Sequence, residues 1–325
     1  MRRSFRIKLA SVTAAAALAL AACSGTTETE STTANANGDG EKYAIVLKVL
    51  SSEFWQKMEQ GIQDKADELG VTVDVYAANT EDDVEGQVAL AENLLGQNYA
   101  GIGLAPLTAD NLINVAAQAT ADGIPVVNID EQMNMEALTA ADGAIIGFVT
   151  TDNVAVGSAG AEFIAEQLGS DGGEVAIIEG KAGTASGEAR KQGATEGFEA
   201  VDTLSLVDSQ PADWDRTKAY DLATNYIAKY PDLKALYCAN DTMAMGAQQA
   251  VQDAGKDIIV VGTDGNADAV ASVESGGLDA TVAQDSAGLG ATSLEMLVNY
   301  VESGETFDSS VTPEEVFIDA ILISE

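Results

Sequence analysis

The sequence predicts an α/β protein of two doubly wound lobes, each with a parallel sheet covered by helices on both faces. Three observations support this prediction. Short continuous apolar segments alternate with amphipathic helical segments, one plan occurs twice along the chain, and 325 residues exceed what one hydrophobic core usually organises. Aromatic residues make up only 5% of the chain, which is typical of an α/β protein rich in Ala, Val and Gly.

The N-terminal segment predicts an export signal. A basic start, "MRRSFRIK", precedes the apolar "LASVTAAAALAL", which is too short to span a bilayer as a stable helix. Leu20 to Cys23 resemble a bacterial lipobox, which implies cleavage after residue 22 and lipidation of the Cys23 sulfur; "RRSF" also loosely resembles a twin-arginine signal. Residues 23–41 are rich in Ser, Thr, Gly and Asn, so we expect a lipidated flexible tether there.

Ten apolar segments are the predicted strands. The first series comprises residues 43–49, 72–78, 99–106, 124–130 and 144–150, and the second comprises 174–180, 204–210, 233–240, 258–264 and 279–285. They are continuous rather than alternating, which indicates parallel strands buried on both faces.

The segments between these strands predict helices. Residues 53–70 and 83–97 carry apolar side chains spaced by three and four, and Gly70 and Gly123 mark predicted helix ends. The two series match in order, which indicates an internal duplication of a β-α-β plan with right-handed crossovers.

The composition excludes several classes of function. The chain has no histidine, which removes the commonest general base and argues against a hydrolase. A net charge of −36 without a basic patch argues against nucleic-acid binding. The sequence contains no glycine-rich phosphate loop, cysteine cluster or EF-hand, so we expect no metal and no cofactor. Cys238 lies in an apolar segment and is expected to be a small buried residue.

Polar and aromatic side chains gather at the predicted carboxyl ends of the strands, where doubly wound sheets bind their ligands. Each has a simpler interpretation by itself: Asp130 and Asp264 as helix caps, Lys48 as a solvated strand end, Arg190 as an exposed helix residue, Trp55 as core. As a set they suit a neutral polyol, because carboxylates accept from hydroxyls, arginine forks onto oxygens, and indole faces cover the C–H patches of a pyranose. The set is Lys48, Phe54, Trp55, Asp130, Glu131, Arg190, Trp214, Asn240, Asp264 and Gln284.

From about residue 42 to the C-terminus the chain resembles the type I periplasmic sugar-binding proteins of the ribose/galactose group, the receptors of ABC importers. "SQPADWDR", "CANDTMAMG", "VTTDNVAVG", "EVAIIEGKAGTASGEAR" and "LAPL" resemble most closely the members that bind D-allose. The resemblance implies two lobes joined by three crossings, near residues 148–152, 284–287 and 309–313. One lobe would comprise residues 42–149 and 286–310, and the other 150–285 and 311–325.

The resemblance also implies a role for each residue of the set. Trp55 and Trp214 would sandwich the sugar ring with Phe54 beside them, and Asp130, Arg190, Asn240, Asp264 and Gln284 would bond its hydroxyls. Lys48 matches the allose-binding members, whereas ribose-binding members carry a small polar residue there and an arginine in place of Glu131. We expect Lys48 and Glu131 to form a charge pair that shapes the pocket for a hexose. "SSEFW" departs from the family pattern, in which an Asn-Pro precedes the aromatic residues.

The expected partners are a monosaccharide, the importer's membrane permease and, through Cys23, the outer face of the cell membrane; we expect a monomer. Four alternatives remain open. The ligand can be ribose, allulose or galactose. The same fold serves receptors for sugar-like signals. A LacI-type regulator shares the two-lobe core but needs a basic DNA-binding segment, which this chain lacks. An enzyme can use Asp130 and Asp264 as a glycosidase acid–base pair.

Overall fold

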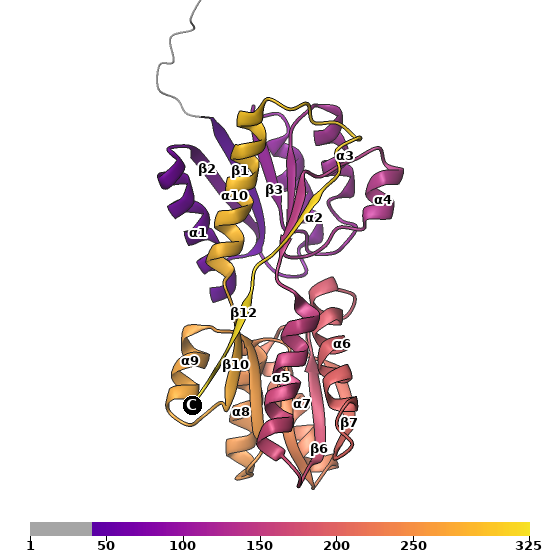
Figure 1. Cartoon of the computed structure of the whole chain (residues 1–325), viewed down its shortest axis with the longest axis vertical. Coiled ribbons are helices and arrows are strands. Elements are labelled where there is room, and N and C mark those ends of the chain that lie inside the picture. The colour runs from indigo at the N-terminus through magenta and orange to yellow at the C-terminus, as the bar shows by residue number, and fades with distance from the viewer. Residues whose placement is uncertain (1–40) are drawn as a thin grey trace, which may run out of the picture. The chain divides into compact units, whose positions relative to one another are not determined.

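The computed structural model describes residues 41–325. The predicted export signal, Cys23 and all of the predicted tether before residue 41 lie outside the described residues. The elements in chain order are β1 (Lys42–Val49), α1 (Glu53–Leu69), β2 (Thr72–Ala78), α2 (Val84–Leu94), β3 (Gly101–Leu104), α3 (Ile113–Ala121), β4 (Val126–Ile129), α4 (Met135–Ala140), β5 (Gly147–Thr150), α5 (Asn153–Leu168), β6 (Gly173–Glu179), α6 (Ala185–Glu199), β7 (Leu204–Pro211), α7 (Arg216–Lys229), β8 (Leu233–Cys238), α8 (Asp241–Ala254), β9 (Ile259–Asp264), α9 (Ala267–Glu274), β10 (Ala280–Gln284), α10 (Ser286–Ser303), β11 (Glu314–Phe317) and β12 (Ala320–Ser324) (Figure 1).

The strands form two six-stranded sheets with the same internal order. The first sheet is β11-β5-β4-β3-β1-β2 and the second is β12-β10-β9-β8-β6-β7. All pairs of the first sheet are parallel, and in the second only β12, beside β10, runs antiparallel. The predicted fold class and the duplication are confirmed, because β1–β5 and β6–β10 occupy equivalent places. We call the first sheet with its helices the first lobe, and the second sheet with its helices the second lobe.

The local sequence explains these elements. β1 is buried from Tyr43 to Val49, as its continuous apolar run predicts. α1 ends at Gly70, whose left-handed φ of 70° lets its N–H donate to the Ala66 carbonyl, and Gly123 adopts the same φ just after α3. Both predicted helix ends are therefore confirmed.

The C-terminal segment differs from the expectation. The sequence resemblance implies that residues 311–325 belong to the second lobe and that the third crossing lies near residues 309–313. β11 instead pairs with β5 in the first sheet, with Glu314 opposite Gly147 and Phe317 opposite Thr150. The chain crosses between Phe317 and Ala320, and only β12 joins the second sheet. This expectation was wrong because β11 is a short, mostly exposed edge strand without a continuous apolar run.

The last long helix completes the first lobe. α10 returns from β10 and packs against α1, and its Leu289, Leu294 and Leu297 are buried in the same core as Tyr43. Within residues 41–325, no helix is both long enough and apolar enough to cross a membrane.

Candidate functional site

A pocket of about 170 Å³ lies at the carboxyl ends of the strands and takes side chains from both lobes. The first lobe contributes residues that follow β1, β2 and β4, and the second contributes residues from α6, the β7–α7 loop and the ends of β8 and β9. The lining residues are Lys48, Val49, Ser51, Ser52, Phe54, Trp55, Glu81, Asp130, Ser186, Arg190, Trp214, Asn240, Thr242 and Asp264.

Eight of the ten residues predicted from the sequence line this pocket: Lys48, Phe54, Trp55, Asp130, Arg190, Trp214, Asn240 and Asp264. Glu131 and Gln284 lie behind the lining. Glu131 is fully buried, and Gln284 is 7% exposed and donates from Nε2 to Asp264 Oδ1 at 2.8 Å. Gln284 Oε1 is buried without a hydrogen-bond partner among the described residues.

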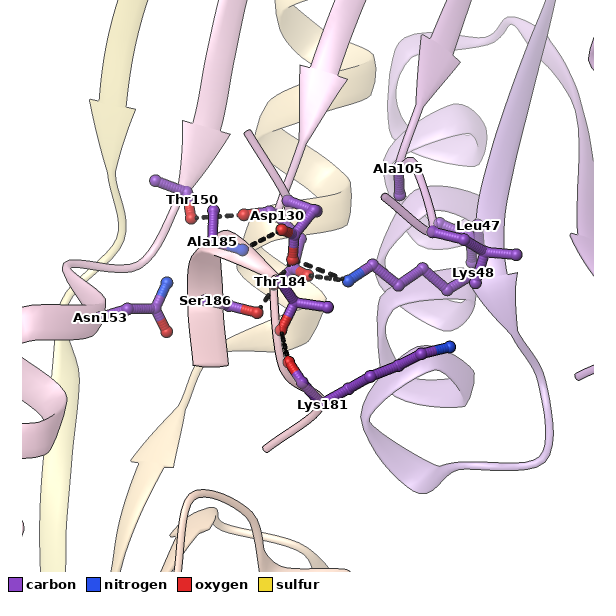
Figure 2. Close-up of polar contacts among 12 residues, drawn as sticks. Leu47, Lys48, Ala105, Asp130, Thr150, Asn153, Lys181, Thr184, Ala185 and Ser186 are labelled. Carbon is purple, nitrogen blue, oxygen red and sulfur yellow. Dashed lines mark hydrogen bonds and ion pairs between the residues drawn. The ribbon is translucent and has the colours of Figure 1, made fainter. Parts of the chain in front are cut away.

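The predicted charge pair between Lys48 and Glu131 is confirmed. Lys48 Nζ lies 3.0 Å from Glu131 Oε2 and 3.8 Å from Asp130 Oδ2. Figure 2 shows Lys48 extending from the end of β1 toward Asp130, with Ala185 and Ser186 at the start of α6 nearby. Glu131 accepts from the Ala185 backbone N–H and, at 3.0 Å, from Ser186 Oγ. One carboxylate therefore connects the pocket lysine to the second lobe.

These contacts keep Lys48 charged inside the protein. Burial alone would lower the pKa of the Lys48 ammonium, but the carboxylates of Glu131 and Asp130 raise it above its ordinary value. Burial raises the pKa of Asp130, and Lys48 opposes that rise. The first lobe thus presents a buried cation between two acids at one end of the pocket.

The second lobe presents a matching arrangement around Arg190. Arg190 Nε donates to Asn153 Oδ1 at 2.8 Å, and one of its terminal nitrogens donates to the Ala239 carbonyl at 2.7 Å and lies 3.4 Å from Asp264 Oδ1. Burial raises the pKa of Asp264 to about 6, and Arg190 opposes the shift. Arg190 is held by three partners, which fixes the guanidinium at the pocket wall.

Asp130 and Asp264 do not cap helices, so the simpler interpretation of these residues is wrong. Asn134 is the cap of α4 and Asn266 the cap of α9. Asp130 and Asp264 occupy equivalent places after β4 and β9, and both have a positive φ, 60° and 118°. Backbone strain of this kind costs about 1–3 kcal/mol and concentrates at binding sites. Here it turns both carboxyl groups toward the pocket.

Aromatic rings cover the pocket from each lobe. Phe54 and Trp55 lie in the first turn of α1 and meet edge to face, with ring centres 5.0 Å apart. Trp214 comes from the β7–α7 loop, where it has a φ of 62°, and its ring lies against Gly180, where any side chain would collide with the indole. The Lys48 ammonium and the Arg190 guanidinium each lie 5.8 Å from an indole, those of Trp55 and Trp214 respectively.

Six lining residues are not in the predicted set, and Glu81 is the only charged one among them. It lies in the loop between β2 and α2, which contains none of the ten predicted residues. Among residues 41–325, no cluster of His, Cys, Asp and Glu side chains is arranged to hold a metal ion, and Cys238 is buried as expected.

Comparison with known proteins identifies the family. A family profile described as "Periplasmic binding protein domain" matches residues 43–306. The chain is 52% identical over 286 residues to the D-allose-binding periplasmic protein of Escherichia coli, covering 87% of this chain and 92% of that protein. It is 34% identical over 236 residues to the ribose import binding protein of Bacillus subtilis, covering 72% and 73%.

A solved structure agrees with these matches. An ABC transporter periplasmic solute-binding protein of Actinobacillus succinogenes, solved with bound D-allose, superposes with a TM-score of 0.81 at 30% identity, covering 87% of this chain and 97% of that one. The relatives are solute-binding proteins rather than enzymes. The chain therefore belongs to the periplasmic binding protein family, with the type I fold of the sugar-binding proteins.

Proposed function

We propose that this protein is the receptor of an ABC sugar importer and binds one monosaccharide, D-allose, between its two lobes. The observation that carries the proposal is the two-sided pocket, in which Trp55 and Asp130 of one lobe face Trp214, Arg190 and Asp264 of the other. A ligand favours closure of two lobes only through contacts that it makes with both of them in the closed state. The similarity to proteins that bind D-allose supports the choice of sugar.

The ligand-binding set comprises the ten residues predicted from the sequence. Eight would contact the sugar directly from the pocket lining. Glu131 and Gln284 would act through their neighbours, because Glu131 bonds Lys48 and Gln284 bonds Asp264. The pair of Lys48 and Glu131 would set the preference for a hexose.

Isothermal titration calorimetry of the purified protein with D-allose, D-ribose, D-allulose, D-galactose and D-glucose tests the proposal. We expect D-allose to bind most tightly and D-ribose measurably more weakly. Failure of all five sugars to bind would reject the sugar-receptor function. Tighter binding of another sugar would keep the function and change the ligand.

The proposed binding role predicts that the sugar is not turned over. Asp264 is held by Gln284 and Arg190, and Asp130 lies beside Lys48, so both acids are placed as hydrogen-bond acceptors. Prolonged incubation with D-allose, and with a chromogenic alloside as glycosidase substrate, is expected to return both compounds unchanged. Release of chromophore that an Asp130→Asn variant abolishes would instead establish the glycosidase alternative.

The N-terminal sequence supports export and anchoring. Cleavage before Cys23 would leave a lipidated cysteine and a tether of residues 23–41, holding a monomeric receptor at the outer face of the cell membrane beside its permease. Radiolabelled palmitate is expected to label the wild-type protein and not a Cys23→Ala variant, and only wild type should partition into detergent. Equal labelling of both proteins would refute the anchor. Native mass spectrometry is expected to give one copy per particle.

A further inference from the structure

The loop between β2 and α2 brings an acid to the pocket that the predicted set does not contain. Glu81 lines the pocket and is half-buried. The loop is held from its own lobe by Asp83, whose carboxylate accepts from Asn79 Nδ2 at 2.9 Å and from the Gly86 N–H at 3.1 Å. From the second lobe, Lys181 Nζ donates to the Glu81 carbonyl at 2.7 Å. The backbone of Glu81 is thus fixed by both lobes.

The carboxylate of Glu81 differs from the other acids of the pocket. Asp264 accepts from Gln284 at 2.8 Å, and Asp130 lies 3.8 Å from the Lys48 ammonium. Among residues 41–325 the Glu81 carboxylate has no hydrogen bond and no ion pair, and burial raises its pKa. The carboxylate is partly desolvated and accepts from no protein donor among these residues, so a ligand that supplies a hydroxyl donor there forms a charge-assisted hydrogen bond.

The cations near Glu81 are already engaged. Lys48 Nζ lies 3.0 Å from Glu131, and Lys181 Nζ lies 2.6 Å from Asp82 Oδ1. An anionic group on a ligand would therefore meet Glu81 without a free cation to neutralise it, whereas a neutral hydroxyl would meet an acceptor.

We propose that Glu81 is a further specificity-determining residue, which accepts a hydrogen bond from one hydroxyl of the bound sugar at the Lys48 end of the pocket and disfavours anionic sugars. This inference rests on the proposed sugar-binding function. It adds an acceptor from the loop after β2, which supplies none of the ten residues of the predicted set.

The test combines side-chain variants of the protein with sugar analogues that each lack one hydroxyl, and titration calorimetry measures the affinity of every combination. The proteins are wild type, Glu81→Ala, Glu81→Gln and the control Glu85→Ala, which removes an exposed acid of the same α2 region outside the pocket lining. The ligands are D-allose and its monodeoxy analogues. We expect Glu81→Ala to weaken D-allose binding about 10- to 100-fold, as for a hydrogen bond to a charged group. Glu85→Ala should bind like wild type.

One analogue identifies the contacted hydroxyl. Wild type should bind the analogue that lacks this hydroxyl more weakly than it binds D-allose. Glu81→Ala should bind that analogue and D-allose with nearly equal affinity, because the variant has already lost the hydrogen bond to this hydroxyl. If every analogue loses the same factor in both proteins, Glu81 makes no hydroxyl contact and the inference is overturned. Ligand-free melting of each variant excludes a folding defect as the cause of weak binding.

The predicted discrimination against anionic sugars is tested separately, by the affinity of a negatively charged sugar. The uronic acid of allose is expected to gain affinity for Glu81→Gln relative to wild type, while neutral D-allose loses affinity. Equal discrimination in the two proteins overturns this part of the inference. If wild type binds none of the neutral sugars, the proposed function itself fails, which is a different result from sugar binding that ignores Glu81.

Discussion

Breaking the buried pair of Lys48 and Glu131 should destabilise the protein far more than breaking an exposed pair. Both side chains are almost inaccessible to solvent, and their charged atoms lie 3.0 Å apart. Glu131→Gln keeps the shape of the side chain but leaves the Lys48 ammonium with Asp130 alone, at 3.8 Å. Removing one partner of a buried pair costs about 3–5 kcal/mol. Because Asp130 remains, we expect the lower end of that range.

The companion variants separate the pair from its surroundings. Lys48→Met combined with Glu131→Gln removes both charges, so the double variant should be more stable than Glu131→Gln alone. The expected coupling energy in the free energy of unfolding is about 2 kcal/mol or more, since residues in one buried network couple by about 0.5–3 kcal/mol. Urea unfolding of the ligand-free protein at neutral pH, followed by circular dichroism, measures it.

An exposed pair provides the control. Lys218 and Asp213 lie 2.7 Å apart, but their side chains are 60% and 40% exposed. Neutralising them should give a coupling energy below about 1 kcal/mol. If the effects of Lys48→Met and Glu131→Gln simply add, the two side chains do not act as a buried pair and the reasoning is refuted.

Three other predictions concern the pocket. Burial raises the pKa of Asp264 to about 6 in the folded protein, above its unfolded value, so Asp264 should make the protein lose stability as pH rises from about 4 to 6. Asp264→Asn should remove this contribution to the pH dependence of the urea unfolding midpoint. An unchanged pH dependence in the variant would contradict the raised pKa of Asp264. Gly180→Ala should displace the Trp214 ring and weaken sugar binding about 10-fold or more, because an aromatic contact with the sugar is lost. Gly96→Ala is the control, because a methyl group at Gly96 meets no neighbouring atom, and this variant should bind sugar like wild type in the same calorimetric titration. Both tryptophans of the chain line the pocket, so sugar should change the intrinsic fluorescence, and Trp214→Ala should lose a large part of that change; an unaltered signal would place the sugar elsewhere.

Strands β1–β10 could be predicted from the sequence because a strand covered on both faces carries a continuous apolar run, as β1 does most clearly. β12 escaped prediction because an edge strand has no such requirement: Ile321 is 69% exposed and Leu322 39%. The pairing of β11 with β5 depends on where the chain crosses, which no local pattern encodes.

The residues of the candidate site, like the strands, could be predicted only where the local sequence is distinctive. Lys48, Asp130 and Trp214 could be found because a charge or an indole is conspicuous at the end of an apolar strand. Glu81 could not, because it lies in "TEDD", which reads as an ordinary solvated acidic loop. Only the tertiary structure shows that one of these acids lines the pocket while its neighbour Asp82 is held by Lys181.

The late return of α10 and β11 to the first lobe has a consequence for biosynthesis. During translation β1–β5 emerge well before α10, whose Leu289, Leu294 and Leu297 complete the core around Tyr43. The nascent first lobe therefore exposes apolar surface until nearly the whole chain has been made, which creates a period of susceptibility to aggregation. Contacts between residues so distant in sequence also slow folding. A chain of this topology is suited to chaperone protection during synthesis, and its two lobes mature almost together rather than one after the other.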